Sequence, residues 1–331
     1  MDTMRALVLE TIGAELVARD LPMPIAGPGQ VLVEIHASGV NPLDTKIRAG
    51  AAAHARVSVP AVLGIDLAGT VAALGEGVTG FAVGDGVYGL TGGIGDNQGS
   101  LAEYAAVDAR LLALKPKSLS MLETASLPLA AITAWEGLVD RAGVGAGDVV
   151  LVQGGAGGVG HLAIQLAISQ GATVFATGSQ HSFAVIREAG ATPIDRTTPV
   201  DQYLASATAG EGFDVVFDAV GGAALDDSFH AVRVYTGHVV SILGWGTHAL
   251  APLSFRGATY SGVFSLLPLL TGRGREHHGD ILSSIAELVD AGSIKPRLAP
   301  TAYSWGSVEA AHADAASPSG AGKIVVDLTR D

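Results

Sequence analysis

The sequence predicts an α/β fold in which a small β-barrel precedes a doubly wound parallel sheet of the Rossmann type. Three observations predict it. Residues 1–115 hold many short apolar stretches separated by glycine turns. Strand-like and helix-like segments alternate after about residue 120 at the period of β–α–β units. Within that second part, a glycine-rich turn at residues 154–160 directly follows an apolar strand and begins a helix.

The first part of the chain is predicted to be mostly β-structure. Residues 4–10 and 31–37 have strand character, and the second stretch alternates with a period of two. The connection between them, residues 22–29, is rich in proline and glycine, which interrupt a sheet. Further short strands are expected at residues 69–74, 86–90, 101–107 and 111–115. Many short strands with this punctuation predict a small barrel.

The second part alternates between strands and helices. A helix is expected over residues 121–142, with an interruption at Pro128. The parallel strands are expected at residues 149–152, 173–177, 213–219, 239–243 and within 256–267. The helices between them are expected at residues 182–189, 199–207 and 223–232. An amphipathic helix at residues 281–291 and a last strand at residues 322–327 complete the chain.

The length of 331 residues is enough for about two domains. The predicted parallel sheet lies in the middle of the chain, so the β-rich part is expected to be completed by C-terminal residues. We therefore expect residues 1–124 and 268–331 to form the barrel domain together, and residues 125–267 to form the Rossmann domain.

The composition excludes several classes of protein. Hydrophobic residues make up 48% of the chain and charged residues 15%, which is typical of a globular protein. The net charge of −13 opposes binding to the phosphate backbone of a nucleic acid. No apolar run reaches the roughly 18 residues of a membrane span, and the N-terminus lacks the pattern of a signal peptide. Without cysteine no disulfide forms, which leaves the compartment open. Because no targeting segment is recognised, the cytoplasm is the expected location.

The turn at residues 154–160 has the spacing G-x-G-x-x-G, supplied by Gly155, Gly157 and Gly160. Glycine at these places permits a tight turn, lets the backbone approach a pyrophosphate and lets the helix pack against the strand. The helix that follows directs its N–H groups and the positive end of its dipole at the phosphates. The sequence therefore predicts a dinucleotide site, formed by Gly155, Ala156, Gly157, Gly158 and Val159.

The end of the second parallel strand indicates which nicotinamide cofactor is expected. Sites for NAD usually place Asp or Glu about 20 residues after the glycines, where the carboxylate binds the ribose 2′-hydroxyl. Here Thr177, Gly178 and Ser179 stand at that end. This small neutral end leaves room for a 2′-phosphate, to which Ser179 can donate. Arg196, which follows a candidate third strand ending near Ile194, could clamp the phosphate through paired hydrogen bonds. NADPH is therefore favoured over NADH, with an ordinary loop charge as the alternative for Arg196.

Several segments in a fixed order carry a family resemblance over nearly the whole chain. They are GVNPLDT at residues 39–45, VLGIDLAG at 62–69, GDGVY at 84–88, GSLAEY at 99–104, TAW at 133–135, the glycine turn at 154–160, FDVVFD at 213–218 and GKIV at 322–325. In their order and spacing the chain resembles the medium-chain dehydrogenase/reductases, specifically the zinc-independent quinone oxidoreductase branch. The resemblance implies a GroES-like barrel domain, discontinuous in sequence, joined to a Rossmann domain with the active site between them. It also implies a homodimer.

The resemblance further implies site residues. Asn41, Asp44 and Lys46 share one segment at the nicotinamide end of the site and are the catalytic candidates, with Asn41 also expected to bind the cofactor. Many family members have Tyr at the position of Lys46, and a surface ion pair between Asp44 and Lys46 is the alternative. Thr133 matches a residue that binds the nicotinamide carboxamide, or else serves helix packing. The remaining cofactor-binding candidates are Leu243 and Val263.

No metal site is expected. Catalytic zinc needs three protein ligands, usually Cys, His and Glu or Asp, and structural zinc commonly needs four Cys. Zinc-dependent relatives would carry Cys close to position 39 and a His-Glu pair near 65–66, where this chain has Gly39, Ile65 and Asp66. The one metal-like grouping, EHHGD at residues 276–280, matches no common metal motif and is expected to be a solvated loop.

Without a metal ion, alcohol oxidation lacks its usual means of stabilising an alkoxide. We therefore expect hydride transfer from NADPH to a small-molecule quinone or α,β-unsaturated carbonyl, whose conjugation spreads the developing charge. The protein's part is to bind, orient and exclude water. One alternative is a reductase of alkenal, 2-haloacrylate or enoyl-thioester double bonds. Another is a non-catalytic NADPH-binding redox sensor.

Overall fold

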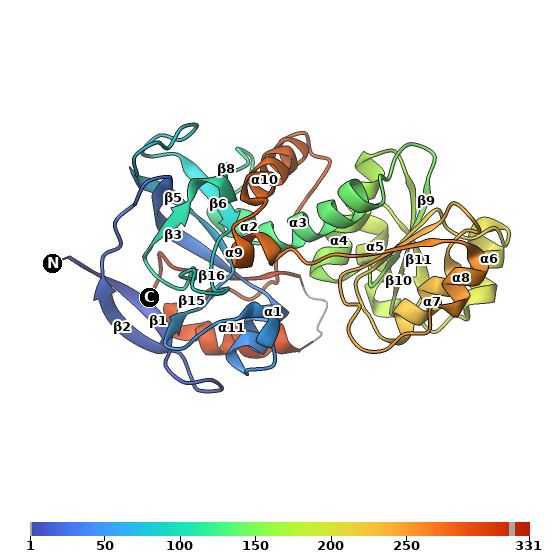
Figure 1. Cartoon of the computed structure of the whole chain (residues 1–331), viewed down its shortest axis with the longest axis horizontal. Helices are drawn as coiled ribbons and strands as arrows, with labels where there is room; N and C mark the ends of the chain where they lie inside the picture. Colours follow the sequence, from blue (N-terminus) through green and yellow to red (C-terminus); the bar gives the residue numbers. More distant parts are fainter. Residues whose placement is uncertain (1, 318–321) are drawn as a thin grey trace. The chain divides into compact units, whose positions relative to one another are not determined.

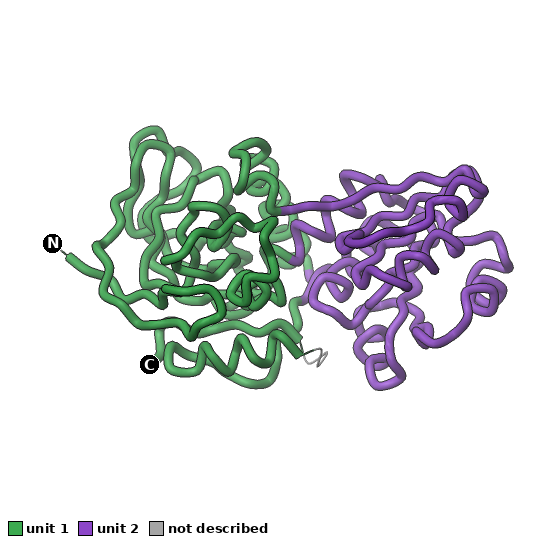
Figure 2. Tube along the Cα trace, turned by 60° about the horizontal axis from the view of Figure 1, so that its bottom comes forward, with its two compact units in different colours: residues 1–129, 266–291, 296–331 green, residues 130–265, 292–295 purple. Residues whose placement is uncertain are grey.

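The computed structural model describes residues 2–317 and 322–331, and the chain divides into two compact units (Figure 1). Unit 1 comprises residues 1–129, 266–291 and 296–331, and unit 2 comprises residues 130–265 and 292–295 (Figure 2). Unit 1 is thus assembled from three separate stretches of the chain. Unit 2 is nearly continuous, with only a short C-terminal piece added to it.

Unit 1 is built on two largely antiparallel sheets. A three-stranded sheet has the order β2–β1–β4, with β1 at Thr3–Leu9, β2 at Val17–Pro22 and β4 at Ala61–Val62. A seven-stranded sheet has the order β15–β16–β3–β5–β6–β8, with β7 also paired to β3. Its strands are β3 Gln30–Val40, β5 Asp66–Leu74, β6 Gly86–Leu90, β7 Tyr104–Asp108, β8 Leu112–Leu114, β15 Tyr303–Ser304 and β16 Ile324–Asp327.

The long strand β3 organises this barrel. It pairs antiparallel with β5, β7 and β16, so that the C-terminal strand of the chain lies beside the N-terminal part. Its register with β5 shifts between Leu32 and Val33 and again between Ile35 and Ala37. Such irregularities bend a strand, which lets β3 follow the curvature of the barrel. The predicted GroES-like barrel is confirmed.

Short helices cover unit 1. They are α1 Pro42–Arg48, α2 Met121–Ala125, α9 Leu267–Thr271, α10 Arg275–Asp290 and α11 Val308–Ala316. The first two begin at capping residues: the N–H of Asn41 donates to Oδ2 of Asp44 over 2.8 Å, and Glu123 and Ser120 bond reciprocally at the start of α2. Helix α11 packs beside α1 (Figure 1).

The expectation of a solvated loop at residues 276–280 is wrong, because this segment lies inside α10. His278 is fully buried there. The apolar face of α10, formed by Ile281, Leu282, Ile285 and Val289, continues backwards by one helical turn through His278. Because residues 276–280 are polar or glycine, the sequence did not show that the helical periodicity of buried positions extends back to His278.

Unit 2 is a six-stranded parallel sheet of the order β11–β10–β9–β12–β13–β14. Its strands are β9 Val149–Gln153, β10 Thr173–Gly178, β11 Thr192–Asp195, β12 Val215–Asp218, β13 His238–Ser241 and β14 Thr259–Gly262. Counted along the chain, this is the order 3-2-1-4-5-6 of a doubly wound Rossmann sheet, which confirms the predicted fold class. The order reverses between β9 and β12, where such sheets bind their ligands beyond the carboxyl ends of the strands.

The helices of unit 2 connect these strands. They are α3 Pro128–Trp135, which begins just before the unit boundary, α4 Gly158–Ser169, α5 Phe183–Glu188, α6 Val200–Thr208, α7 Ala223–Ala231 and α8 Ala251–Arg256. Because the sheet grows outward in both directions from β9 and β12 and crossovers are right-handed, α4 and α7 cover opposite faces. The aromatic rings of Tyr203, Phe213 and Phe229 fill one core beside the sheet. No helix in the described part of the chain is long and apolar enough to cross a membrane.

Most predicted elements are found within a few residues of their expected bounds. The helical stretch 121–142 breaks before Pro128 as predicted, and its last part, Glu136–Arg141, is a π-helix. The strands β2, β4 and β15 were missed, because β2 is largely exposed and β4 and β15 have only two residues each. None of them carries a buried apolar run that a sequence pattern would show.

Candidate functional site

The glycine turn joins β9 to α4 at the carboxyl end of the central strand. Gly154 has a φ angle of +77°, which side chains other than glycine rarely adopt. A Cβ atom on Gly155 would lie 2.5 Å from the Cβ of Ala176, and one on Gly160 would lie 2.2 Å from the carbonyl oxygen of Gly154. Glycine is therefore required at these positions for the close packing of strand, turn and helix.

The N-terminal end of α4, where the glycine turn meets the helix, fits a pyrophosphate. Gly157 is the N-cap of α4, and no side chain in the described ranges caps the helix there. Gly157 and Gly158 are exposed, while Ala156 and Val159 beside them are half-buried. Because the first N–H groups of a helix have no acceptor within it and its dipole is positive at this end, the turn attracts an anion. The residues present thus fit the phosphates of a dinucleotide.

Thr177 fixes the turn to the neighbouring strand. Its hydroxyl donates to Oε1 of Gln153 over 2.7 Å and accepts the N–H of Gly154 over 3.1 Å. Its carbonyl oxygen accepts the N–H of Gly155 over 2.9 Å. Thr177 and Gln153 are both buried. The predicted cofactor residue Thr177 therefore holds the backbone of the turn in place.

The end of β10 brings Gly178, Ser179 and Arg196 together. The N–H of Arg196 donates to the carbonyl oxygen of Gly178 over 2.9 Å, and the Arg196 side chain is exposed. The register also places Asp195 opposite Gly178, a carboxylate that the position along the chain did not reveal. Its Oδ1 accepts the N–H and hydroxyl of Thr197, which lowers the pKa of Asp195. Arg196 and the Asp195 carboxylate, which is hydrogen-bonded to Thr197, thus lie beside the end of β10.

The candidates for the nicotinamide end of unit 2 lie on α3 and after β13 and β14. The hydroxyls of Thr133 and Ser265 are 3.0 Å apart and both side chains are buried. The N–H of Leu243 donates to the Ser241 hydroxyl, and that of Val263 to the Ser241 carbonyl oxygen. Hydrogen bonds through one serine therefore set the backbone at Leu243 and Val263.

Unit 1 holds a buried polar cluster around Asn41. The side-chain amide of Asn41 donates to Oδ2 of Asp66 over 3.0 Å, and its Oδ1 accepts a hydrogen bond from Lys323. The N–H of Asn41 donates to Asp44, as described above. Oδ1 of Asp66 accepts the N–H of Leu129 over 2.8 Å, and Nζ of Lys323 lies 3.9 Å from Oδ2 of Asp66. Four residues from three distant parts of the chain thus form one network.

Burial changes the acid strength of this cluster. Desolvation raises the pKa of Asp44 to about 7 and that of Asp66 to about 6, although Lys323 and hydrogen bonds from Asn41 oppose the rise. Desolvation likewise lowers the pKa of Lys323, against the attraction of the two carboxylates. Oδ1 of Asp44 has no hydrogen-bond partner within the described residues. Burial therefore brings the pKa values of both carboxyls closer to neutral pH than those of exposed aspartates.

The structure separates Lys46 from the other catalytic candidates. Asp44 is 2% exposed at the start of α1, whereas Lys46 is exposed on the same helix. The alternative of a surface ion pair between Asp44 and Lys46 is therefore wrong. Residues two positions apart point to different sides of a helix, which explains the separation.

The environment of Gly39 leaves little space for a zinc-binding side chain at this position. A Cβ atom at this position would lie 2.2 Å from the carbonyl oxygen of Ala125 and 3.0 Å from the Cβ of Asp66. A cysteine ligand here would require α2 to move. Within residues 2–317 and 322–331, no three His, Cys, Asp or Glu side chains lie close enough together to hold a metal ion.

Sequence reasoning missed three residues that shape these sites: Gln153, Asp66 as a partner of Asn41, and Lys323. Asp66 and Lys323 stand in two of the segments that carry the family resemblance, but nothing in either segment indicates that they meet at Asn41. Gln153 closes an apolar strand, and a polar residue at that end was the available signal.

Comparisons with known proteins agree with this architecture. Residues 27–117 match the model of the alcohol dehydrogenase GroES-like domain, and residues 189–326 match that of the zinc-binding dehydrogenase family. The chain is 36% identical to a 2-methylene-furan-3-one reductase of Solanum lycopersicum, over 93% of this chain and 74% of the relative. It is also 36% identical to a chloroplastic NADPH-dependent alkenal/one oxidoreductase of Arabidopsis thaliana, over 85% of this chain and 67% of the relative.

A solved structure of high similarity is that of an alcohol dehydrogenase superfamily protein from Novosphingobium aromaticivorans. It has 53% sequence identity and a TM-score of 0.96, and the alignment covers 98% of this chain and 100% of the other. The similarity therefore extends over both units, through the barrel and the glycine turn alike. The chain belongs to the medium-chain dehydrogenase/reductase superfamily and is an oxidoreductase.

Proposed function

We propose that this oxidoreductase is a metal-free, NADPH-dependent reductase of quinones or α,β-unsaturated carbonyl compounds. Bound NADPH supplies the hydride, and the chain binds, orients and shields the reactants. The names of the two relatives, a 2-methylene-furan-3-one reductase and an NADPH-dependent alkenal/one oxidoreductase, support the conjugated acceptor. The proposal rests on the glycine turn at residues 154–160 of unit 2, combined with the lack of space for a zinc ligand at Gly39.

The end of β10 supports NADPH as the cofactor. Ser179 and the exposed side chain of Arg196 lie at the end of β10, and we assign them to the 2′-phosphate. The Asp195 carboxylate beside them accepts hydrogen bonds from Thr197. An arginine can hold a phosphate through paired charged hydrogen bonds. The relative from Arabidopsis thaliana is named as NADPH-dependent.

The catalytic residues belong to this proposal as well. The amide of Asn41 uses one donor and one acceptor on Asp66 and Lys323, which leaves a second N–H and a second lone pair for the cofactor or the acceptor. Asp44 fixes the backbone of Asn41. Exposed Lys46 is the weakest of the three candidates, and a role for it would be limited to attracting an acceptor. Thr133, with Ser265 as its partner, would bind the carboxamide.

The proposal is tested by following the absorbance of reduced nicotinamide after treatment of the protein with a strong chelator. Each of NADPH and NADH is offered with a small quinone and with an α,β-unsaturated ketone. We expect chelator-resistant turnover that prefers NADPH. Loss of turnover on chelation, restored by zinc, would disprove the metal-free assignment. Tight NADPH binding without turnover on either acceptor would favour the redox sensor instead.

A further inference from the structure

Lys323 directly precedes the C-terminal strand β16. The Lys323 side chain donates a hydrogen bond to Asn41, which lies 282 positions earlier in the chain. The pairing of β16 with β3 makes this possible, since Ile324 lies opposite Val40 in the ladder. The Lys323 side chain is only 11% exposed. Removing an ammonium from water is energetically costly, so a buried lysine needs hydrogen-bonding or charged partners.

Lys323 and Asp66 together allow only one orientation of the Asn41 amide. An ammonium can only donate, so the carbonyl oxygen of the amide must face Lys323. An ionised carboxylate can only accept, so the NH₂ group must face Asp66. Reversing the amide would set two donors against each other and two acceptors against each other. The remaining N–H and lone pair of Asn41 therefore point in fixed directions.

Two ionised carboxyls and one ammonium leave an excess negative charge in the cluster, unless one of the carboxyls is protonated. Two carboxyls, Asp44 on α1 and Asp66 on β5, face the single ammonium of Lys323. The other groups that face them are neutral: the Asn41 amide and the N–H of Leu129. On α11, which packs beside α1, Glu309 pairs with Arg48 over 2.6 Å, and His312 is buried next to this pair. A single proton on Asp44, whose pKa is raised further than that of Asp66, makes the cluster neutral and leaves Asp66 as an ionised acceptor for Asn41.

Lys323 also borders a cavity of about 130 Å³ in unit 1, which is lined by Leu122, Leu298, Tyr303, Val325 and Arg330 among others. The two carboxyls are only 0–2% exposed. Lys323 is thus the member of the cluster that lies at the wall of this cavity.

We propose that Lys323 is a positioning residue of the reductase, which fixes the amide of Asn41 for contact with the cofactor or the acceptor and sets the charge of Asp44 and Asp66 behind it. The inference rests on the proposed function, because it takes Asn41 as a residue of the reaction site. It predicts that removing the ammonium affects the reaction and its pH dependence more than it affects folding. It further predicts that both carboxyls become weaker acids, because the cation that lowers their pKa values is lost.

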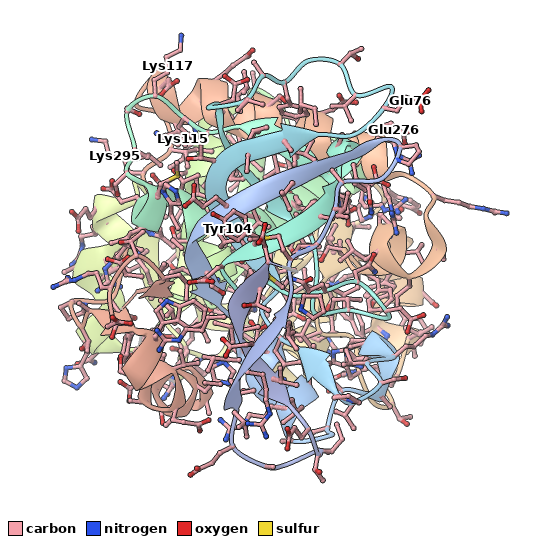
Figure 3. The ribbon with its side chains drawn as sticks, turned by 90° about the vertical axis from the view of Figure 1, so that its left-hand side faces the viewer. Glu76, Tyr104, Lys115, Lys117, Glu276 and Lys295 are labelled. Carbon is pink, nitrogen blue, oxygen red and sulfur yellow. The ribbon has the colours of Figure 1, made fainter. Side chains whose placement is uncertain are left out.

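The test compares Lys323→Met with Lys115→Met. Lys115, labelled in Figure 3, is a half-buried lysine of unit 1 whose Nζ donates to the carbonyl oxygens of Pro116 and Leu119, outside the cluster. Each variant loses a lysine whose Nζ is bonded within unit 1: Lys323 donates to Asn41 and lies 3.9 Å from Asp66, and Lys115 donates to two carbonyl oxygens. We expect Lys323→Met to lose about tenfold or more in kcat, equal to ~1.4 kcal/mol, and Lys115→Met to stay within about twofold. The pH profile of Lys323→Met should move to higher pH.

A second measurement does not depend on turnover. Carbon NMR of the carboxyl groups follows the titration of Asp44 and Asp66 in the cofactor-free protein, and both midpoints should rise in Lys323→Met. Lys323→Gln, which keeps a donor without charge, and Lys323→Arg, which keeps the charge, cover the case in which Met is not tolerated. We expect the arginine variant to retain the wild-type midpoints more closely than the glutamine variant.

The outcomes separate this inference from the proposed function. Wild-type turnover together with unchanged kcat, pH profile and carboxyl midpoints in Lys323→Met would overturn the role of Lys323 alone. A wild-type protein with no turnover on quinones or enones would overturn the proposed function, and the role of Lys323 in the reaction with it. Equal losses in Lys323→Met and Lys115→Met, without any pH shift, would show that Lys323 is only structural.

Discussion

The hydroxyl of Thr177, at the end of β10, donates a 2.7 Å hydrogen bond to Oε1 of Gln153, at the end of β9. The same hydroxyl accepts the N–H of Gly154, the first residue of the turn. Two adjacent parallel strands are thereby joined at the point where the chain leaves the sheet for the glycine turn. The turn is held from the side by a buried threonine as well as by its own backbone.

Replacing Thr177 by valine should weaken NADPH binding. The change keeps the shape of the side chain but leaves Oε1 of Gln153 and the N–H of Gly154 without this partner, at a cost of about 1–3 kcal/mol. We expect the Kd for NADPH to rise about tenfold or more while kcat at saturating NADPH changes little. Thr177→Ser, which keeps the hydroxyl, is the control. Equal affinities for the valine and wild-type proteins would contradict the role of this hydroxyl.

Gly160→Ala should damage the turn directly. A Cβ at this position would lie 2.2 Å from the carbonyl oxygen of Gly154, so the helix start must shift. We expect loss of NADPH binding in calorimetry and a lower midpoint of thermal unfolding. Gly306→Ala is the matched control, because no atom lies within 4 Å of its added Cβ. An intact Kd in Gly160→Ala would mean that the turn does not carry the cofactor.

Arg196→Ala should change the cofactor preference. Loss of the guanidinium removes about 1–3 kcal/mol of charged hydrogen bonding to a 2′-phosphate and takes nothing from NADH. We expect kcat/KM for NADPH to fall about tenfold or more and that for NADH to stay the same, which steady-state kinetics with both cofactors would detect. Arg141→Ala, an exposed arginine elsewhere in unit 2, is the control. Parallel losses for both cofactors would assign Arg196 to structure alone.

His312 on α11 should make the protein less stable in weak acid. Burial and nearby Arg48 lower the pKa of His312 to about 4, from 6.5 in the unfolded chain. Between these values the unfolded chain binds the proton and the folded one does not, so stability falls as the pH drops from 6.5 towards 4. For His312→Leu we expect a smaller loss between pH 7 and pH 5, by about 2 kcal/mol in urea unfolding. An unchanged pH dependence would show that His312 takes up its proton at the same pH in the folded protein as in the unfolded chain.

Local sequence patterns predicted the parts of the site that lie within one turn or one strand end. The glycine turn could be identified because strand, glycines and helix follow one another directly between Val149 and Ser169. Thr177 could be identified because it ends the next strand. The barrel and the doubly wound sheet followed from the density of turns and from the alternation of elements.

Contacts between distant segments were beyond these patterns. Lys323 meets Asn41 only because β16 pairs with β3, and a pairing register cannot be obtained from either strand alone. Asp195 reaches the end of β10 from the following strand for the same reason. Whether Asp44 or Lys46 is buried depends on which side of α1 faces the barrel. The helix has only seven residues, which are too few to reveal a helical period of apolar positions in the sequence.

The most direct test of the central claim uses NADPH that carries deuterium at the reactive carbon of the nicotinamide, with an α,β-unsaturated ketone as the acceptor. The position of the label in the product is determined by NMR. The account predicts a saturated ketone with deuterium at the β-carbon, formed equally well after chelation. An allylic alcohol with deuterium at the former carbonyl carbon, formed only with zinc present, would contradict it.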